Sequence, residues 1–288
     1  MGIKIITDST SYLPESMKQK YDISIVSLSV AFENDVYKEI DITNEDFFNK
    51  LKKSVKIPKS SQPSIEELYN VFENEVKQNN EIVGIFISSE MSGTYSTALM
   101  VKNMIIDKYK DARIEIIDSR SNCMQLGYAV LQAAKAAKEG RAIDEVIKVT
   151  LDNMKRSRFV FIPETLEYLK KGGRIGTAKA LLGNVFQIRP ILTVKDGKTH
   201  VMGKVRTRKR AIEKLVNIFL EDKEQFGLGE VLVHHINCEE EAKDIAEILQ
   251  EKISMPISRV PIGPVIGTHV GPGTIAIVYY TKDEIVTQ

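Results

Sequence analysis

Short apolar runs alternate along the chain with segments in which apolar residues recur at helical spacing. The apolar runs expected to form strands are residues 4–7, 23–32, 82–87, 114–117, 159–162, 191–194, 200–205, 230–236 and 275–280. The segments expected to form helices with one buried face are residues 94–108, 122–139, 143–154, 206–220 and 239–253. Strands that alternate with helices are typical of βα units, so the pattern predicts an α/β protein whose N-terminal sheet is largely parallel.

Local signals sharpen this prediction. Thr43 and Ser64 each stand three residues before an acidic residue, which is the pattern of a capping box at a helix start. Asp196-Gly197 lies between two apolar runs and predicts a β-hairpin. With 288 residues the chain has room for two modest domains. We place the boundary within residues 155–165, which gives α/β domains at 1–158 and 159–288, with the helix at 143–154 as a bridge between them.

Charge and targeting signals exclude several classes of protein. Forty basic residues balance thirty-nine acidic ones, so the chain lacks the strongly basic character of most nucleic-acid-binding proteins. Residues 204–210 are the one dense cationic run. We interpret this run as a solvated helix start that contacts a protein partner, and a DNA-binding regulator is the weaker alternative. Two distant cysteines, no signal peptide and no apolar run of about 18 residues favour a cytoplasmic protein without a transmembrane segment.

The common cofactor and nucleophile motifs are missing. The sequence has no G-x-x-x-x-G-K-[ST], no G-x-G-x-x-G after the first strand and no G-x-S-x-G. His234 and His235 are neighbours on an expected strand, so they face opposite sides and cannot chelate one ion together. We therefore expect neither a metal nor a cofactor.

Hydroxyl-rich turns follow several of the expected strands or open the next helix. They are residues 8–11, 60–64, 88–94 and 118–119. Ligands of open α/β sheets bind at the carboxyl edge of the strands, and hydroxyls beside helix N-termini donate to anions. Taken alone, a single turn such as the one at Ser64 or Asp8 is better explained by helix capping or by hydrogen bonds within the loop. Together they predict an anion site.

These segments, in this order, resemble the DegV family. The motifs that carry the resemblance are TDST at 7–10, SSQPS at 60–64, SSxxSGTY at 88–95, DS at 118–119, LKKGGRIG at 169–176 and IGPVIGTHxGPG at 262–273. The resemblance implies two α/β domains that hold one long-chain fatty acid. It further implies a lipid-binding subunit without catalysis of its own, which presents the fatty acid carboxylate to a separate ATP-dependent fatty acid kinase. The kinase makes acyl phosphate for phospholipid synthesis, and transient contact with a membrane is compatible with this role.

The resemblance also suggests which residues act. It assigns the carboxylate to Ser60 and Ser92, and Ser61 could share or take the role of Ser60, where the family has threonine. Gly93 lets the backbone approach the ligand closely, and Thr94 completes the site. The head-group region that faces the kinase would contain Arg174, Arg206 and His269.

An apolar pocket would supply most of the affinity. A palmitoyl-length tail has about 14 methylenes, and burying them is worth on the order of 11 kcal/mol before the costs of binding. Candidate lining residues are Phe159, Phe161, Ile162, Leu166, Leu181, Leu182, Phe186, Ile188, Ile191 and Ile266. The chain length and unsaturation of the lipid, the oligomeric state and the identity of the kinase stay open.

An enzyme is the main alternative. In a serine hydrolase acting on an acyl ester or thioester, Ser92 would be the nucleophile and His269 the base, oriented by a carboxylate such as Asp8. The missing G-x-S-x-G elbow argues against this alternative.

Overall fold

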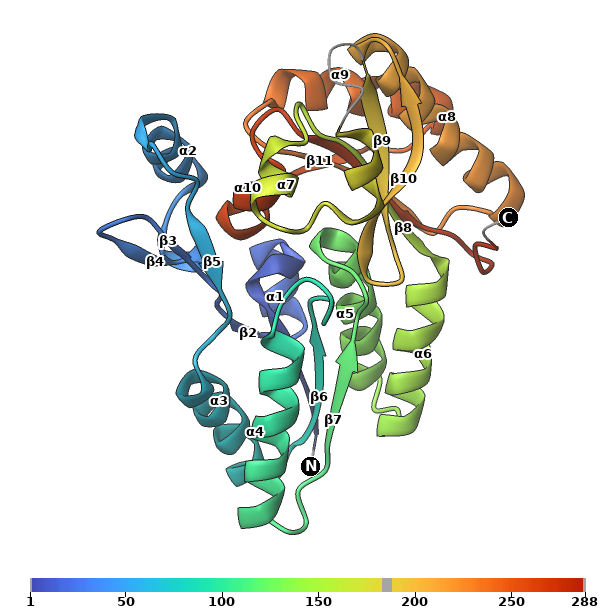
Figure 1. Cartoon of the computed structure of the whole chain (residues 1–288). Coiled ribbons are helices and arrows are strands. Elements are labelled where there is room, and N and C mark those ends of the chain that lie inside the picture. Colours follow the sequence, from blue (N-terminus) through green and yellow to red (C-terminus); the bar gives the residue numbers. More distant parts are fainter. Residues whose placement is uncertain (1, 183–187, 287–288) are drawn as a thin grey trace.

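The computed structural model describes residues 2–182 and 188–286 (Figure 1). A four-stranded parallel sheet forms the centre of the N-terminal half, in the order β2-β1-β6-β7. Its strands are β1 (Ile3–Asp8), β2 (Ser24–Val26), β6 (Glu81–Phe86) and β7 (Ile114–Asp118). All its neighbouring strands pair in parallel, as the alternation of strands and helices predicted.

Helices cover both faces of this sheet. α3 (Ile65–Lys77) and α4 (Thr94–Lys108) pack on one face around the buried side chains of Ile6, Phe72 and Ile105. α5 (Cys123–Lys138) and α6 (Ile143–Arg156) lie on the other face, and the short α1 (Glu15–Lys20) follows the turn η1 (Ser9–Ser11).

A small antiparallel sheet projects from the N-terminal half. It contains β3 (Ser29–Ala31), β4 (Val36–Lys38) and β5 (Lys59–Ser61), and it is accompanied by η2 (Glu39–Asp41) and α2 (Asn44–Lys53). The prediction of one strand over residues 23–32 was therefore wrong. Leu28 leaves the strand pairing because its N–H donates to Ser9 Oγ (3.1 Å) and its carbonyl accepts from Glu39 N (2.8 Å), so β2 and β3 belong to different sheets.

A six-stranded sheet forms the centre of the C-terminal half, in the order β10-β9-β8-β13-β11-β12. Its strands are β8 (Ser157–Ile162), β9 (Arg189–Lys195), β10 (Lys198–Val205), β11 (Glu230–His235), β12 (Ser258–Pro261) and β13 (Ile275–Tyr280). All its pairs are antiparallel except β11 with β12. β9 and β10 form the predicted hairpin, with positive φ at Asp196 and Gly197.

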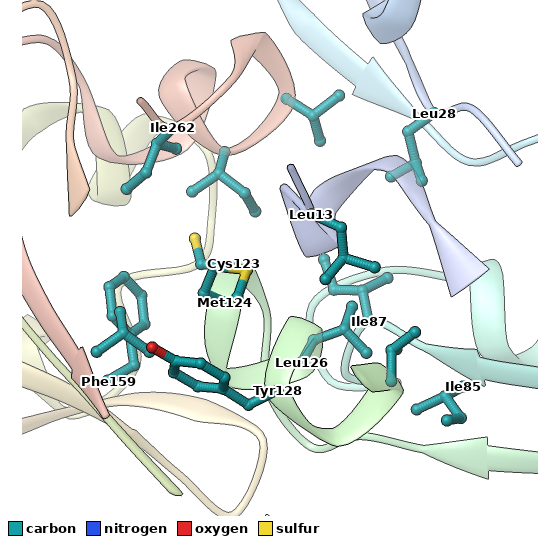
Figure 2. Close-up of a cluster of buried hydrophobic side chains, with 14 of the residues drawn as sticks. Leu13, Leu28, Ile85, Ile87, Cys123, Met124, Leu126, Tyr128, Phe159 and Ile262 are labelled. Carbon is teal, nitrogen blue, oxygen red and sulfur yellow. The ribbon is translucent and has the colours of Figure 1, made fainter. Parts of the chain in front are cut away.

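One face of this second sheet is covered by α8 (Arg208–Phe226) and α9 (Glu239–Ile253). The other face meets the N-terminal half through a large buried cluster (Figure 2). Ile85 of the parallel sheet, Met124 and Tyr128 of α5, and Phe159 of β8 all belong to that cluster. α5 therefore packs between the two sheets.

Three short elements complete the junction of the two halves. They are α7 (Glu167–Lys171), η3 (Gly176–Leu181) and α10 (Pro264–Val270). Within the described ranges, no helix combines the length and apolarity that a bilayer crossing requires.

Candidate functional site

A narrow cavity of about 40 Å³ lies where the two halves meet. Six of its lining residues are polar, and four of these, Ser60, Ser92, Arg174 and His269, had been singled out from the sequence. The other lining residues are apolar. The lining residues are Leu28, Ser60, Ile87, Met91, Ser92, Asn122, Phe159, Phe161, Leu169, Arg174, Val194, Thr199, Val265, Ile266, His269 and Val270. The cavity thus combines a few hydrogen-bonding groups with an apolar wall.

Ser60 and His269 meet across the cavity from the two halves of the chain. Ser60 lies on β5 and His269 on α10, and Ser60 Oγ is 2.8 Å from His269 Nε2. Burial, and to a lesser degree the positive charge of Arg174, lowers the pKa of His269 to about 4. The imidazole is therefore neutral at pH 7. Its Nδ1 atom is buried and has no hydrogen-bond partner among residues 2–182 and 188–286.

Ser92 lies in the turn between β6 and α4. Its Oγ is 2.9 Å from Thr94 Oγ1 and accepts from Thr94 N (3.3 Å). Gly93, the N-cap residue of α4, allows a close approach: a Cβ atom there would lie 2.0 Å from Gln62 Oε1. Gln62 in turn donates to Thr97 Oγ1 (2.6 Å) in the first turn of α4. This contact holds the segment that carries Ser60 against the turn that carries Ser92.

The remaining predicted site residues are divided between the cavity and the surface. Arg174 lines the cavity, where Nε and Nη2 donate to Met91 O (3.0 and 2.9 Å). Ser61 is exposed and is not a lining residue, because neighbouring residues of a strand face opposite sides. Thr94 is fully buried and contacts Ser92 rather than the cavity. Arg206 is exposed between β10 and α8, away from the cavity lining.

Part of the predicted acyl-chain pocket is found in the cavity wall. Phe159, Phe161 and Ile266 line it. Ile162 and Ile191 were wrong choices, because they face the other side of the sheet and pack in the cluster beneath α8. Of the other candidates, Leu166, Leu181, Leu182 and Ile188 are partly buried outside the cavity wall, and Phe186 lies outside the described residues.

Sequence reasoning missed Asn122, which lines the cavity at the start of α5. The residue is 5% exposed, and its Nδ2 donates to Met91 Sδ (3.0 Å). Its Oδ1 is buried without a hydrogen-bond partner in the described part of the chain. The only signal was its place three residues after the polar turn at 118–119, so a contact with Met91 could not be foreseen.

The contacts of the three hydrolase candidates do not form a catalytic triad. Ser92 Oγ is bonded to Thr94, and His269 is bonded to Ser60. Asp8 accepts from Ile87 N (2.7 Å) and Thr10 N (3.0 Å) at the end of β1, and burial raises its pKa to about 6. A nucleophile needs its base within hydrogen-bond reach and the base needs an orienting partner, and neither contact is formed.

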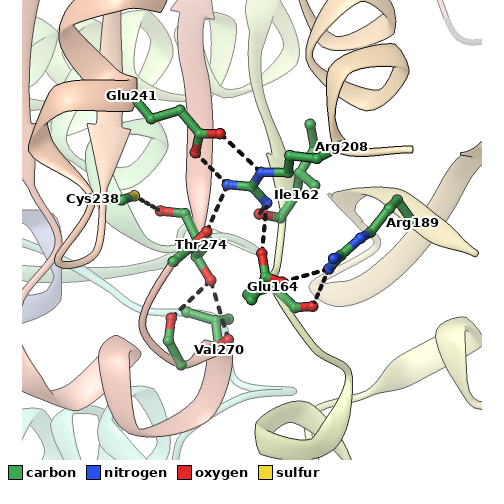
Figure 3. A network of polar contacts seen from close by, with 10 residues as sticks. Ile162, Glu164, Arg189, Arg208, Cys238, Glu241, Val270 and Thr274 are labelled. Carbon is green, nitrogen blue, oxygen red and sulfur yellow. Dashed lines mark hydrogen bonds and ion pairs between the residues drawn. The ribbon is translucent and has the colours of Figure 1, made fainter. Parts of the chain in front are cut away.

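The cationic run at 204–210 is partly used inside the molecule. Arg208 donates to both carboxylate oxygens of Glu241 (3.1 and 2.5 Å) and to Gly273 O (2.7 Å), as Figure 3 shows in part. Glu164 Oε2 lies 3.8 Å from Arg208 Nη1, and Glu164 Oε1 accepts a hydrogen bond from Arg189 Nη1 (2.8 Å). Lys204, Arg206, Lys209 and Arg210 stay exposed. The network fixes the loop after α10, where Thr274 Oγ1 donates to Val270 O.

Comparisons with known proteins agree on one family. The family model described as "Uncharacterised protein, DegV family" matches residues 2–282. A DegV domain-containing protein of Clostridium acetobutylicum is 56% identical over 282 residues, which cover 98% of this chain and 99% of that protein. One similar solved structure is "DegV, a fatty acid binding protein from Bacillus subtilis", with a TM-score of 0.88 and 33% identity; the match covers 98% of this chain and 100% of that one. Another is a stearic acid-binding protein from Eubacterium ventriosum, with a TM-score of 0.89 and 27% identity; the match covers 97% of this chain and 98% of that one. A sequence match over nearly the whole chain and the same fold lead to one conclusion: the chain belongs to the DegV family.

Proposed function

We propose that the protein binds one long-chain fatty acid in this cavity and presents the carboxylate to a separate ATP-dependent fatty acid kinase. The observation that carries the proposal is that Ser60, Ser92 and a neutral His269 line one largely apolar cavity, with Ser60 and His269 in contact. Solved structures that are similar to this chain and are described as fatty acid-binding proteins support a fatty acid as the ligand. The chain itself would perform no catalysis, and the kinase would form the acyl phosphate used in phospholipid synthesis.

The polar groups suit a carboxylate. A neutral imidazole with its hydrogen on Nε2 would donate to Ser60 Oγ, which leaves the Ser60 hydroxyl hydrogen free for the ligand. In that tautomer the buried Nδ1 carries no hydrogen that would need an acceptor. The positive charge of Arg174, which lowers the pKa of His269, also favours the neutral imidazole. Ser92 offers a second hydroxyl. Hydrogen bonds to a charged acceptor are worth more than neutral ones, so two hydroxyls suffice to orient the head group.

The tail would enter between the two halves. The cavity holds about 40 Å³, whereas a single water needs about 10–15 Å³ on the same measure, so an acyl chain must push the walls apart. Met91 and Leu169 are the adaptable wall residues, because an unbranched methionine fills irregular space and α7 is short. Burial of the tail, at about 0.8 kcal/mol per methylene, offsets the displacement.

This assignment divides the work between the two parts of the chain. Residues 1–158 would supply the carboxylate hydroxyls of Ser60 and Ser92, with Gly93 and Thr94 shaping the turn. Residues 159–288 would supply His269 and the wall residues Phe159 and Phe161. The exposed Arg206 and its basic neighbours would meet an acidic surface of the kinase. A cytoplasmic location, with transient membrane contact when lipid is exchanged, follows from this role.

Native mass spectrometry of the purified protein, followed by extraction and identification of the lipid, tests the proposal. We expect one free fatty acid per chain. Ser92→Ala should weaken oleate retention about tenfold, the value of one hydrogen bond to a charged group. Ser89→Ala is the matched control, since Ser89 lies in the same turn but donates to Asp118 (2.6 Å) outside the cavity.

Two results would contradict the proposal. A delipidated protein that refuses labelled oleate would exclude the carrier function. Covalent labelling of Ser92 by a fluorophosphonate probe would favour the hydrolase instead. For the kinase step, a fatty acid kinase supplied with ATP should form acyl phosphate, trapped by hydroxylamine, from the loaded protein, and more slowly from Ser92→Ala at equal total oleate.

A further inference from the structure

One short helix brings the C-terminal half to the cavity. α10 contributes Val265, Ile266, His269 and Val270 to the cavity wall. Its N-cap residue is Gly263, which has no side chain that could bond the free N–H groups of the first turn. The placement of this helix decides whether His269 reaches Ser60, so the groups that hold its first turn matter for the site.

Glu39 and Tyr12, both from the N-terminal half, take these free N–H groups. Glu39 Oε1 accepts from Val265 N (2.9 Å) and from the Tyr12 hydroxyl (2.9 Å). The Tyr12 oxygen in turn accepts from Ile266 N (3.2 Å). A Cβ atom on Gly263 would lie 2.6 Å from the Tyr12 ring and 2.8 Å from Glu39 Oε1, so the chain closes tightly on this pair.

The surroundings of Glu39 are unusual for a carboxylate. The residue is 6% exposed, and its other oxygen accepts from Ser9 Oγ (2.5 Å). Buried charges are normally paired, yet no ion pair of Glu39 occurs among the described residues. The charged or titratable groups that face it are Asp8, Tyr12 and Cys123. The carboxylate of Glu39 is therefore held by hydrogen bonds from the hydroxyls of Ser9 and Tyr12 and from Val265 N of α10.

The far end of α10 has independent anchors. Thr274 Oγ1 donates to Val270 O (3.1 Å; Figure 3), and Arg208 Nη2 donates to Gly273 O (2.7 Å). Before the helix, Asn44 Nδ2 donates to Ile262 O (3.1 Å). Figure 1 shows α2 and the small sheet beside α10, which agrees with their contacts. The first turn itself is bonded from outside by Glu39 and Tyr12.

We propose that Glu39, with Tyr12, is a positioning residue of the binding site: it fixes the first turn of α10 so that His269 reaches Ser60 across the junction of the two halves. This inference rests on the proposed function, in which the Ser60–His269 pair orients the carboxylate. Glu39 does not touch the ligand. It acts through the helix that carries His269.

The test compares oleate dissociation from the full-length, reloaded protein and its variants. Glu39→Leu removes all three hydrogen bonds and should speed dissociation about tenfold. Glu39→Gln can accept from Val265 N and Tyr12 and donate to Ser9, so it should recover most of the retention. Tyr12→Phe, which removes one bridge, should give an intermediate effect.

Tyr279→Phe is the matched control for a purely structural loss. Tyr279 is a fully buried tyrosine whose hydroxyl, like that of the partly buried Tyr12, donates to a buried carboxylate, here Asp222, but it packs beneath α8 on the other face of the sheet. Its loss should lower the melting temperature and leave oleate dissociation unchanged. Glu39→Leu that stays folded and releases oleate at the wild-type rate would overturn the inference.

A double-mutant cycle separates positioning from general destabilisation. In a His269→Ala background, Glu39→Leu should change dissociation less than about threefold, because the residue it positions is already gone. An equal effect with and without His269 would overturn the inference. The ¹⁵N shifts of the His269 ring supply a readout without lipid: they should move in Glu39→Leu and not in Tyr279→Phe. A wild type that binds no oleate refutes the proposed function, while unmoved shifts refute the positioning role.

Discussion

Replacing Glu39 by glutamine should change how the stability of the protein depends on pH. Burial raises the pKa of Glu39 from its ordinary 4.5 to about 7, against the opposing effect of hydrogen bonds from Ser9, Val265 and Tyr12. The folded state therefore binds this proton more tightly than the unfolded state. The stability that the proton contributes is fully present below pH 4.5 and is lost as the pH rises through about 7.

The size of the effect follows from the two pKa values. One pKa unit corresponds to 1.36 kcal/mol, so the contribution of Glu39 is about 3 kcal/mol for this fully buried group. Glutamine does not titrate and reproduces the hydrogen-bond pattern of the protonated acid. The wild type minus Glu39→Gln difference in unfolding free energy should thus fall by about 3 kcal/mol between pH 4.5 and pH 7.5.

Urea unfolding of both proteins at several pH values across this range measures the difference. Other groups also make the stability of the protein depend on pH. Asp8, whose pKa is raised to about 6, lowers the stability as the pH rises. His234 and His269, whose pKa values are lowered to about 4, lower it as the pH falls below 6.5. The two histidines are common to both proteins and cancel in the difference, and Asp8 cancels apart from its charge interaction with Glu39, the smallest of the causes that shift the Glu39 pKa. A difference that stays constant from pH 4.5 to 7.5 would refute the reasoning.

Three further changes test other parts of the site. Gly93→Ala should cost only about 0.5–1.5 kcal/mol in urea unfolding, because the added Cβ would lie 2.0 Å from Gln62 Oε1 and the flexible Gln62 side chain would have to give up its hydrogen bond to Thr97; in a Gln62→Ala background this cost should disappear. Arg174→Gln should raise the pKa of His269 above about 4 but leave it below 6.5, since burial is the larger cause; an unchanged histidine NMR titration would contradict this. Phe161→Ala should cost about 3–5 kcal/mol, and oleate should restore its melting temperature more than that of Phe219→Ala, a buried control beneath α8.

Features set by neighbouring residues could be predicted from the sequence. The caps at Thr43 and Ser64 are confirmed, because each hydroxyl accepts from the backbone N–H three residues on (3.1 Å). The parallel sheet predicted from the alternation of strands and helices is confirmed. The hairpin predicted from Asp196-Gly197 is confirmed too. The break at Leu28 was missed, since it depends on Ser9 and Glu39, which are distant in the sequence.

The candidate site shows the same limit. Ser60, Ser92, Arg174 and His269 stand in recognisable motifs, and all four line the cavity. Ile162 was assigned to the wrong face because apolar runs on both faces of a buried strand look alike, and a shift of one residue reverses the side. Glu39 carries no motif, and its contact with α10 joins positions 226 residues apart.

The large cluster shown in Figure 2 has a consequence for how lipid leaves the protein. Because Ile85, Tyr128 and Phe159 share one core, a hinge motion of the two halves would expose that core to water. Release should therefore proceed through local opening of small elements such as α7 or α10, with the sheets held together. The residence time of the lipid would then report the local stability of a few turns, and substitutions that leave global stability unchanged could still tune it.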